Sequence, residues 1–126
     1  MIKKDRDLLK EKCDTLWSLL VKIKVGYKCE KCGSKNGIQS HHIFKRKHMA
    51  TRFVIENGMC LCFVCHEWVE KNPKRFSDWA VFKIGNEMYE SLDRLHRQIH
   101  QPNFQTEYER LKGIEKEFQE RDKNGK

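Results

Sequence analysis

Residues 56–68 read ENGMCLCFVCHEW and place three cysteines within six residues, the last of them directly followed by a histidine. A second cysteine pair lies upstream in the stretch 27–33, which reads YKCEKCG. Two thiolates separated by two residues can face one ion at about 2.3 Å each, and two such pairs complete the tetrahedral ligand set of a structural zinc ion. The sequence therefore predicts a structural zinc site with the ligands Cys29, Cys32, Cys62 and Cys65.

The expected compartment supports a metal site over disulfides. No apolar run approaches the roughly 20 residues that span a bilayer, and the first residues lack the apolar block of a signal peptide. We expect a cytoplasmic protein with no membrane partner, in which thiols stay reduced. A redox-active Cys-x-x-Cys is the alternative, but nothing around either pair reads as a βαβ unit. The two remaining cysteines, Cys13 and Cys60, are interpreted as buried thiols.

The charge of the chain is strongly and unevenly positive. The net charge is +8, from 26 lysines and arginines against 18 aspartates and glutamates. The excess lies in residues 1–28 and 41–75, whereas residues 107–126 are balanced. A basic field around the cysteine pairs favours a polyanion such as DNA or RNA. An ordinary solvated basic surface is the alternative, which charge alone does not exclude.

The length of 126 residues predicts a single domain over residues 1–126, and the hydrophobic pattern within it predicts an α+β fold. An amphipathic helix over 3–24 ends at Gly26, and its apolar face is interpreted as facing the core. Short strands are predicted near 37–44 and 58–62, and a short helix over 65–71 is stopped by Asn72-Pro73.

Two or three further helices are expected after this centre, at 78–84 with Ser77 as N-cap, at 86–100 and at 104–121. Their apolar stripes, including Ile99, and the aromatic residue Phe82 are interpreted as packing surfaces. The domain is thus divided into an N-terminal helix, a zinc-supported core and C-terminal helices, over residues 1–26, 27–72 and 73–126.

The 29 residues between the cysteine pairs contain the candidate catalytic residues His41 and His42. They contain IQSHHIF at 38–44, with the adjacent histidines His41 and His42. One imidazole can bind a divalent cation while its neighbour acts as a general base near neutral pH, and phosphodiester hydrolysis needs that division of labour. His66 follows the second zinc pair, where the zinc turn would direct it toward His41 as a further ligand of a catalytic metal.

The paired histidines, followed by N-x-x-x-L-C-x-x-C-H over 57–66, resemble the HNH endonucleases. The resemblance covers residues 29–68 and implies a ββα-metal core on a four-cysteine zinc site. The surrounding text also resembles small phage HNH proteins, among them the recombination nucleases called NinG or Rap, which implies the cytoplasm of a bacterial host.

The resemblance implies a role for each motif residue. His41 and His66 would bind the catalytic metal, and His42 would be the general base that activates water. Asn57 would hold the loop and orient His42, or would touch the metal. A metal with few protein ligands and several waters suits Mg²⁺ or Mn²⁺. Family members with a third histidine place it where this chain has Glu70, which is either a ligand or a surface carboxylate.

The roles of His41 and His42 depend on one geometric condition. Neighbouring residues of a strand point to opposite faces, so His41 and His42 can share a site only if the strand ends or twists there. The basic residues near the motif are hypothesised to contact the DNA backbone without reading bases: Lys45, Arg46, Lys47, Arg52, Lys74 and Arg75.

Three functions are therefore compared. A metal-dependent DNA endonuclease uses the histidines and Asn57 together. A non-catalytic zinc module that binds nucleic acid needs only the four cysteines and the basic loop. A four-cysteine protein-interaction domain leaves the paired histidines unexplained. The endonuclease is the preferred interpretation, with the DNA structure it cuts, its base specificity and its oligomeric state left open.

Overall fold

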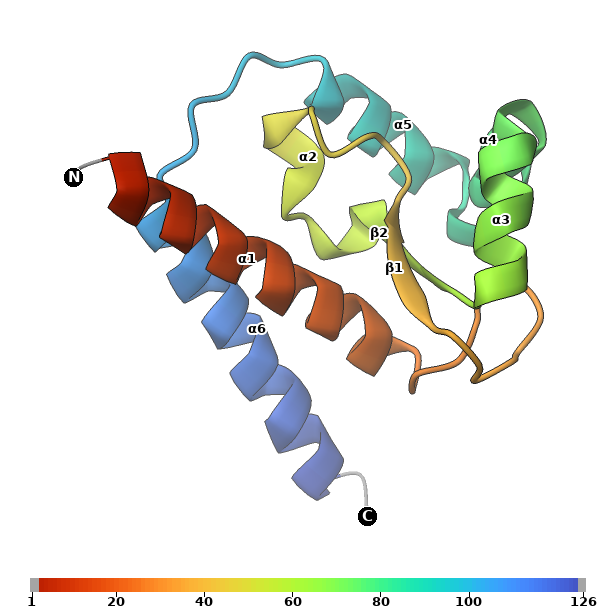
Figure 1. Cartoon of the computed structure of the whole chain (residues 1–126), viewed down its shortest axis with the longest axis horizontal. Helices are drawn as coiled ribbons and strands as arrows, with labels where there is room; N and C mark the ends of the chain where they lie inside the picture. Colours follow the sequence, from red (N-terminus) through yellow and green to blue (C-terminus); the bar gives the residue numbers. More distant parts are fainter. Residues whose placement is uncertain (1–2, 125–126) are drawn as a thin grey trace.

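The computed structural model describes residues 3–124, which form an α+β fold that is mostly helical (Figure 1). No helix in this range is both long and apolar enough to cross a membrane. The elements, in chain order, are α1 (Lys3–Lys24), β1 (Gln39–His42), α2 (Met49–Arg52), the 3-10 turn η1 (Ile55–Asn57), β2 (Gly58–Leu61), α3 (Phe63–Lys71), α4 (Pro73–Ile84), α5 (Asn86–His96) and α6 (Phe104–Asn124).

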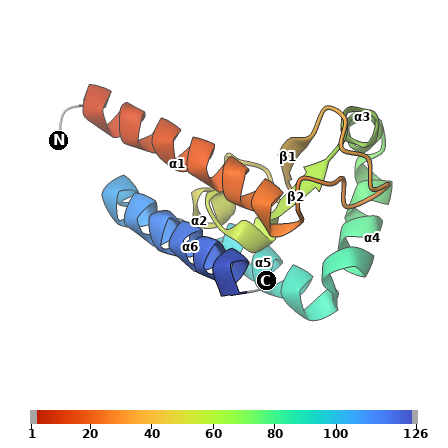
Figure 2. The ribbon, with the colours of Figure 1, turned by 90° about the horizontal axis from the view of Figure 1, so that it is seen from below.

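Helix α1 packs along α6, and the two helices run in the same general direction (Figures 1 and 2). The predicted helix over 3–24 is thus confirmed, and Gly26 ends it with a left-handed φ of +67°. Its apolar face meets α6 and the turn before β2 in one hydrophobic cluster, which we call the helical core: Cys13, Leu16, Trp17, Leu20, Val21, Phe53, Ile55, Cys60, Phe104 and Leu111.

Strands β1 and β2 form an antiparallel hairpin in which His42 pairs with Gly58 and His41 with Met59. Both strands lie where the sequence predicts them. Helix α1 packs on one side of the hairpin and α3 on the other (Figures 1 and 2). Gly58 permits this close approach, because a Cβ there would clash with Val21 and lie 2.8 Å from Trp17 Cζ2.

A second hydrophobic cluster joins the hairpin to α3 and α4. We call it the cysteine core: Cys29, Met59, Leu61, Cys62, Cys65, Val69, Phe76 and Ala80. The expected start of a helix after Ser77 is wrong, because α4 already begins at Pro73. A proline is favourable at the first position of a helix, because a backbone N–H there would have no acceptor within the helix and proline has no N–H. Ser77 lies inside the helix, and its hydroxyl donates to the Pro73 carbonyl at 3.2 Å.

Two other packing predictions are corrected in this part of the chain. Helix α5 ends at His96, so Ile99 lies beyond it and is fully exposed. Phe82 is 83% exposed because it lies on the face of α4 turned away from the cysteine core. The stripe on α6 is confirmed, since Leu111 is buried and Tyr108, Ile114 and Phe118 pack against the helical core.

Candidate functional site

The four cysteines predicted as zinc ligands come together, with all four Sγ atoms within 4.8 Å of one another. Tetrahedral bonds of about 2.3 Å require sulfur atoms about 3.8 Å apart. The Sγ atoms of Cys32 and Cys62 are 3.5 Å apart, close to that spacing, and all four cysteines are free thiols. The cluster therefore fits a metal ion such as zinc in both chemistry and dimensions.

Local backbone geometry produces the two cysteine turns. Gly33 has a left-handed φ of +81°, and its N–H closes the first turn on the Cys29 carbonyl at 2.9 Å. In the second turn, the Cys65 N–H points at the Cys62 sulfur at 3.5 Å, at the start of α3. Glu30 fastens the first turn to β2, because its carboxylate accepts the Cys60 N–H at 2.7 Å.

Cys13 and Cys60 lie outside this cluster and are completely buried. Burial, aided by nearby acidic side chains, raises the pKa of each thiol to about 11. The prediction that these two residues are buried thiols is confirmed.

A second group of potential ligands combines His41 of β1 with two residues of α3. The ligand atoms of His41, His66 and Glu70 all lie within 4.8 Å of one another. His66 stands in the first turn of α3, where its N–H bonds the Cys62 carbonyl at 2.8 Å, so the cysteine turn determines its direction. Glu70 follows one helical turn later, with Oε1 at 3.8 Å from His66 Nε2.

His41 is held between these ligands and α4. Its ring meets His66 edge to face at 5.2 Å and Phe76 edge to face at 5.1 Å. Burial and the neighbouring His66 lower the pKa of His41, with Glu70 opposing them. A neutral imidazole is the form that binds metal, so this setting favours the ligand state.

His42 points to the other face of the hairpin, toward α1. Its ring stacks on Trp17 with centroids 3.9 Å apart and planes 7° apart. Its Nε2 lies 3.0 Å from the Arg52 carbonyl oxygen, and a carbonyl only accepts, so Nε2 carries the proton. Burial lowers the pKa of His42 to about 4, which keeps the ring neutral at pH 7. Nδ1 of this tautomer is then an acceptor.

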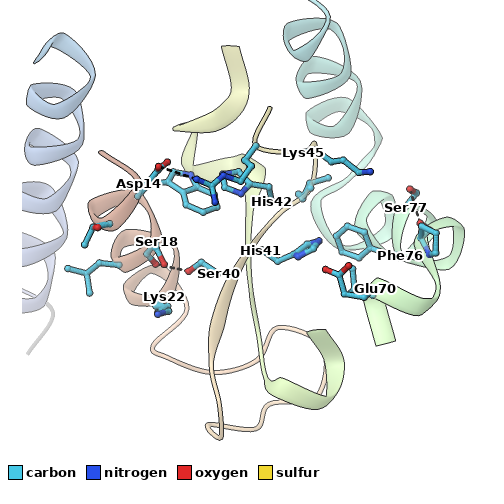
Figure 3. Close-up of a pocket in the computed structure, with 17 residues that line it drawn as sticks. Asp14, Ser18, Lys22, Ser40, His41, His42, Lys45, Glu70, Phe76 and Ser77 are labelled. Atoms are coloured by element: carbon cyan, nitrogen blue, oxygen red, sulfur yellow. Dashed lines mark hydrogen bonds and ion pairs between the residues drawn. The ribbon is translucent and has the colours of Figure 1, made fainter. Parts of the chain in front are cut away.

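The two histidines point to opposite faces of the hairpin, but they do not lie in separate clefts. His41 and His42 both line a cleft of about 1130 Å³, with α1 as one wall and α3 and α4 as the other (Figure 3). In the close-up, His41 points toward Glu70 and Phe76, while His42 lies on the side of Asp14 (Figure 3). The two imidazoles are therefore directed to opposite walls of a common space.

Asn57 is fully buried, and within residues 3–124 the hydrogen bonds of its side chain all go to backbone atoms. Its Oδ1 accepts the Phe44 N–H at 2.8 Å, and its Nδ2 donates to the carbonyls of Phe44 at 3.0 Å and Thr51 at 3.2 Å. These bonds join the start of the loop that follows His42, at Phe44, to Thr51 of α2 through the side chain of Asn57. The geometry agrees with the loop-holding alternative for Asn57.

The expected phosphate contacts divide into two kinds. Lys45 and Arg46 are exposed and line the cleft, and Lys47, Lys74 and Arg75 are exposed without lining it. Arg46 also reaches Asp14, at 3.5 Å, but its side chain is 66% exposed. Arg52 is different, because its side chain is 6% exposed and its guanidinium bonds the Asp14 carboxylate at 2.7 Å and 2.9 Å. We therefore correct its role from a phosphate contact to a buried ion pair.

Sequence reasoning missed the contribution of α1 to the cleft. Asp14, Trp17 and Lys22 all line it. Trp17 follows Leu16 on the apolar face of the helix, where a tryptophan is normally interpreted as a residue of the hydrophobic core. Nothing in the order of residues 14–22 indicates that this face meets a histidine from another element.

Comparison with family models, with curated proteins and with solved structures found no match. No relative therefore assigns a role to any residue of the cleft.

Proposed function

We propose that this chain is a divalent-metal-dependent DNA endonuclease of the HNH type, with the hairpin and α3 as its ββα-metal core. One observation carries the proposal. His41 lies in a set of three metal-compatible side chains, and the adjacent His42 keeps an acceptor nitrogen, in the same cleft. The nearby four-cysteine cluster holds α3 at the hairpin, as the HNH resemblance implies.

The proposed metal site consists of His41 and His66, with Glu70 as third ligand. The carboxylate and the water molecules that would fill the other positions suit Mn²⁺ or Mg²⁺, whereas the two imidazoles also suit a later divalent ion such as Ni²⁺ or Zn²⁺. Such an ion would neutralise charge on the phosphate and on the leaving oxygen during phosphodiester hydrolysis. The spacing of the three ligand atoms supports this assignment.

His42 is proposed as the general base. Its Nδ1 accepts the proton of the attacking water, while the Arg52 carbonyl keeps Nε2 protonated. The lowered pKa means that the ring is already neutral at physiological pH and ready to accept a proton. The same low pKa makes His42 a weak base, so the phosphate must also be activated electrostatically by the opposite wall of the cleft.

The other residues of the core are proposed to hold this geometry. The zinc cluster sets the start of α3 and thereby His66, and Asn57 fixes the loop after His42. Lys22, Lys45 and Arg46 line the cleft and would meet backbone phosphates without reading bases. The narrower likeness to phage recombination nucleases makes nicked or branched DNA a natural second substrate.

The test incubates zinc-loaded protein with supercoiled plasmid in Mg²⁺, Mn²⁺ or EDTA, beside His42→Ala. As matched control we choose His100→Ala, because His100 is exposed and does not line the cleft. Nicked or linear product that requires the metal, survives in the control and disappears in His42→Ala supports the proposal. If folded, zinc-loaded protein binds but cleaves neither plasmid nor branched DNA, the proposal fails and a non-catalytic zinc module replaces it.

A further inference from the structure

Helix α1 contacts His42 directly through Trp17. The indole lies flat beneath the imidazole, 3.9 Å away between ring centroids. Trp17 is itself fixed, since it is 2% exposed and its Nε1–H donates to the Val54 carbonyl at 2.8 Å. Its ring also lies close to Gly58, the strand partner of His42. The stack therefore fixes the plane of the imidazole against an immobile surface.

The same helix reaches His42 by a second, indirect route. Asp14 accepts two bonds from the Arg52 guanidinium, at 2.9 Å from Nε and 2.7 Å from Nη2. The carbonyl of Arg52 accepts from His42 Nε2 at 3.0 Å. Arg52 is thus anchored through its side chain while its main chain holds the ring of His42. This bond fixes the rotation of the imidazole within its plane.

We propose that Trp17 and Asp14 are positioning residues that aim Nδ1 of His42 into the cleft. A flat stack alone lets the ring turn in its plane, and a single hydrogen bond alone lets it tilt. Together they leave one orientation and one tautomer. This inference rests on the proposed hydrolysis, because an aimed acceptor nitrogen matters only if it takes a proton.

A pair of variants at Trp17 separates positioning from ordinary packing. Trp17→Phe and Trp17→Leu both lose the bond to Val54, but only leucine removes the aromatic face. For Trp17→Leu we expect kcat for plasmid nicking to fall on the order of 10²-fold with KM little changed, because a misplaced catalytic group has effects of that size. Trp17→Phe is expected to recover most of that loss. Equal kcat values in the two folded variants would overturn the proposal.

Asp14→Asn tests the second route in a side chain that is 27% exposed, so the fold is expected to persist. Its control is Asp5→Asn, an exposed carboxylate in the first turn of the same helix. We expect Asp14→Asn to lower kcat severalfold and Asp5→Asn to leave it unchanged. If Trp17→Leu does not fold, this pair decides the proposal alone, and an unchanged kcat in Asp14→Asn overturns it.

An independent readout separates this inference from the proposed function. Nitrogen-15 NMR of the histidine rings reports the Nε2–H tautomer, and the stacked indole shifts the His42 ring protons upfield. We expect both signatures in the wild type, loss of the upfield shift in Trp17→Leu, and a mixed tautomer in Asp14→Asn. If the wild type cleaves no DNA, these spectra still decide the inference, and unchanged spectra in both variants overturn it.

Discussion

His41 of β1 and His66 of α3 meet edge to face with ring centroids 5.2 Å apart. Each is directed by its own element: His41 by the register of the hairpin, and His66 by the cysteine turn that opens α3. Glu70 completes the group from the next turn of the helix. The meeting of these two imidazoles is therefore the observation on which the proposed second metal site beside the cysteine cluster depends.

If this group binds a metal ion, as proposed, removing one of its three side chains should weaken the binding of Mn²⁺. For Glu70→Gln we expect the dissociation constant to rise at least roughly tenfold, since even groups outside the coordination shell have effects of that size. The measurement is calorimetric titration of zinc-loaded protein with Mn²⁺. The control is Glu67→Gln, an exposed carboxylate on the same helix that pairs with Lys71 at 2.9 Å. Equal affinities in the two variants would assign Glu70 to the surface.

Loss of zinc should disrupt one of the two hydrophobic clusters more than the other. Three of the four clustered cysteines, Cys29, Cys62 and Cys65, belong to the cysteine core, whereas α1 and α6 pack in the helical core. We expect Cys62→Ser to lose zinc and to expose the amides of α3 and α4 to hydrogen exchange, because the metal joins the turn before α3 to the first cysteine turn. The protection of α1 should change least.

Cys60→Ala is the matched control, because Cys60 is buried outside the cysteine cluster. It should keep one zinc per chain and the exchange pattern of the wild type in α3. Uniform loss of protection across α1 and α3 in Cys62→Ser would show that the two clusters unfold as one unit.

The sequence predicted the local parts of the structure well. Within each of the pairs Cys29/Cys32 and Cys62/Cys65 the geometry depends on only a few residues, and the meeting of the two pairs could be anticipated because one tetrahedral ion needs four ligands. The ends of α1 and the two strands were predicted for the same reason, since periodicity and glycines indicate them directly. The predicted start of α4 was wrong, because Pro73 follows the end of α3 and is itself the first residue of the next helix.

Contacts between distant elements could not be predicted in this way. Arg52 looked like one more basic residue of the loop, and only the approach of α1 shows that Asp14 neutralises it. Trp17 likewise looked like core, which it is, but its ring also faces His42. Such pairs depend on how α1 docks on the hairpin, and no short motif encodes that docking.

The docking of α1 depends on Gly58, which gives a stability prediction. Gly58→Ala should lower the free energy of unfolding by about 1–3 kcal/mol, because its Cβ would overlap Val21 and crowd Trp17. Gly113→Ala on α6 has open space around the new Cβ and should be stabilising by about 0.5–1 kcal/mol. Urea unfolding of both variants provides the measurement. Equal effects at the two positions would contradict the close packing of α1 on β2.

The buried thiol of Cys13 predicts a loss of stability at alkaline pH. Its pKa is raised to about 11 in the folded chain by burial, and by Glu107 and Asp14, against about 9 for an ordinary thiol. The folded state therefore binds the thiol proton more tightly than the unfolded state does. The contribution of this proton to the free energy of unfolding is complete below pH 9 and is lost as the pH rises toward 11.

Other groups also titrate in this range, so the difference between wild type and Cys13→Ala is the quantity to follow. The stability advantage of the wild type should be constant below pH 9 and should then shrink by on the order of 2 kcal/mol up to pH 11. A difference that does not change with pH would mean that the thiolate is accommodated in the folded chain.

Two lysines that line the cleft give a last prediction, which depends on the proposed function. Lys22 reaches the cleft from α1 and Lys45 from the loop after β1. If both meet phosphates, each alanine substitution should weaken DNA binding similarly for all sequences and reduce the salt dependence, d log K/d log[salt], by about 1. Fluorescence anisotropy with a labelled duplex at several salt concentrations measures both quantities. Lys116→Ala, exposed on α6 where charges are balanced, is the control for net charge alone. If it changes the slope as much as the other two, binding follows overall charge, and the cleft does not select the path of the DNA.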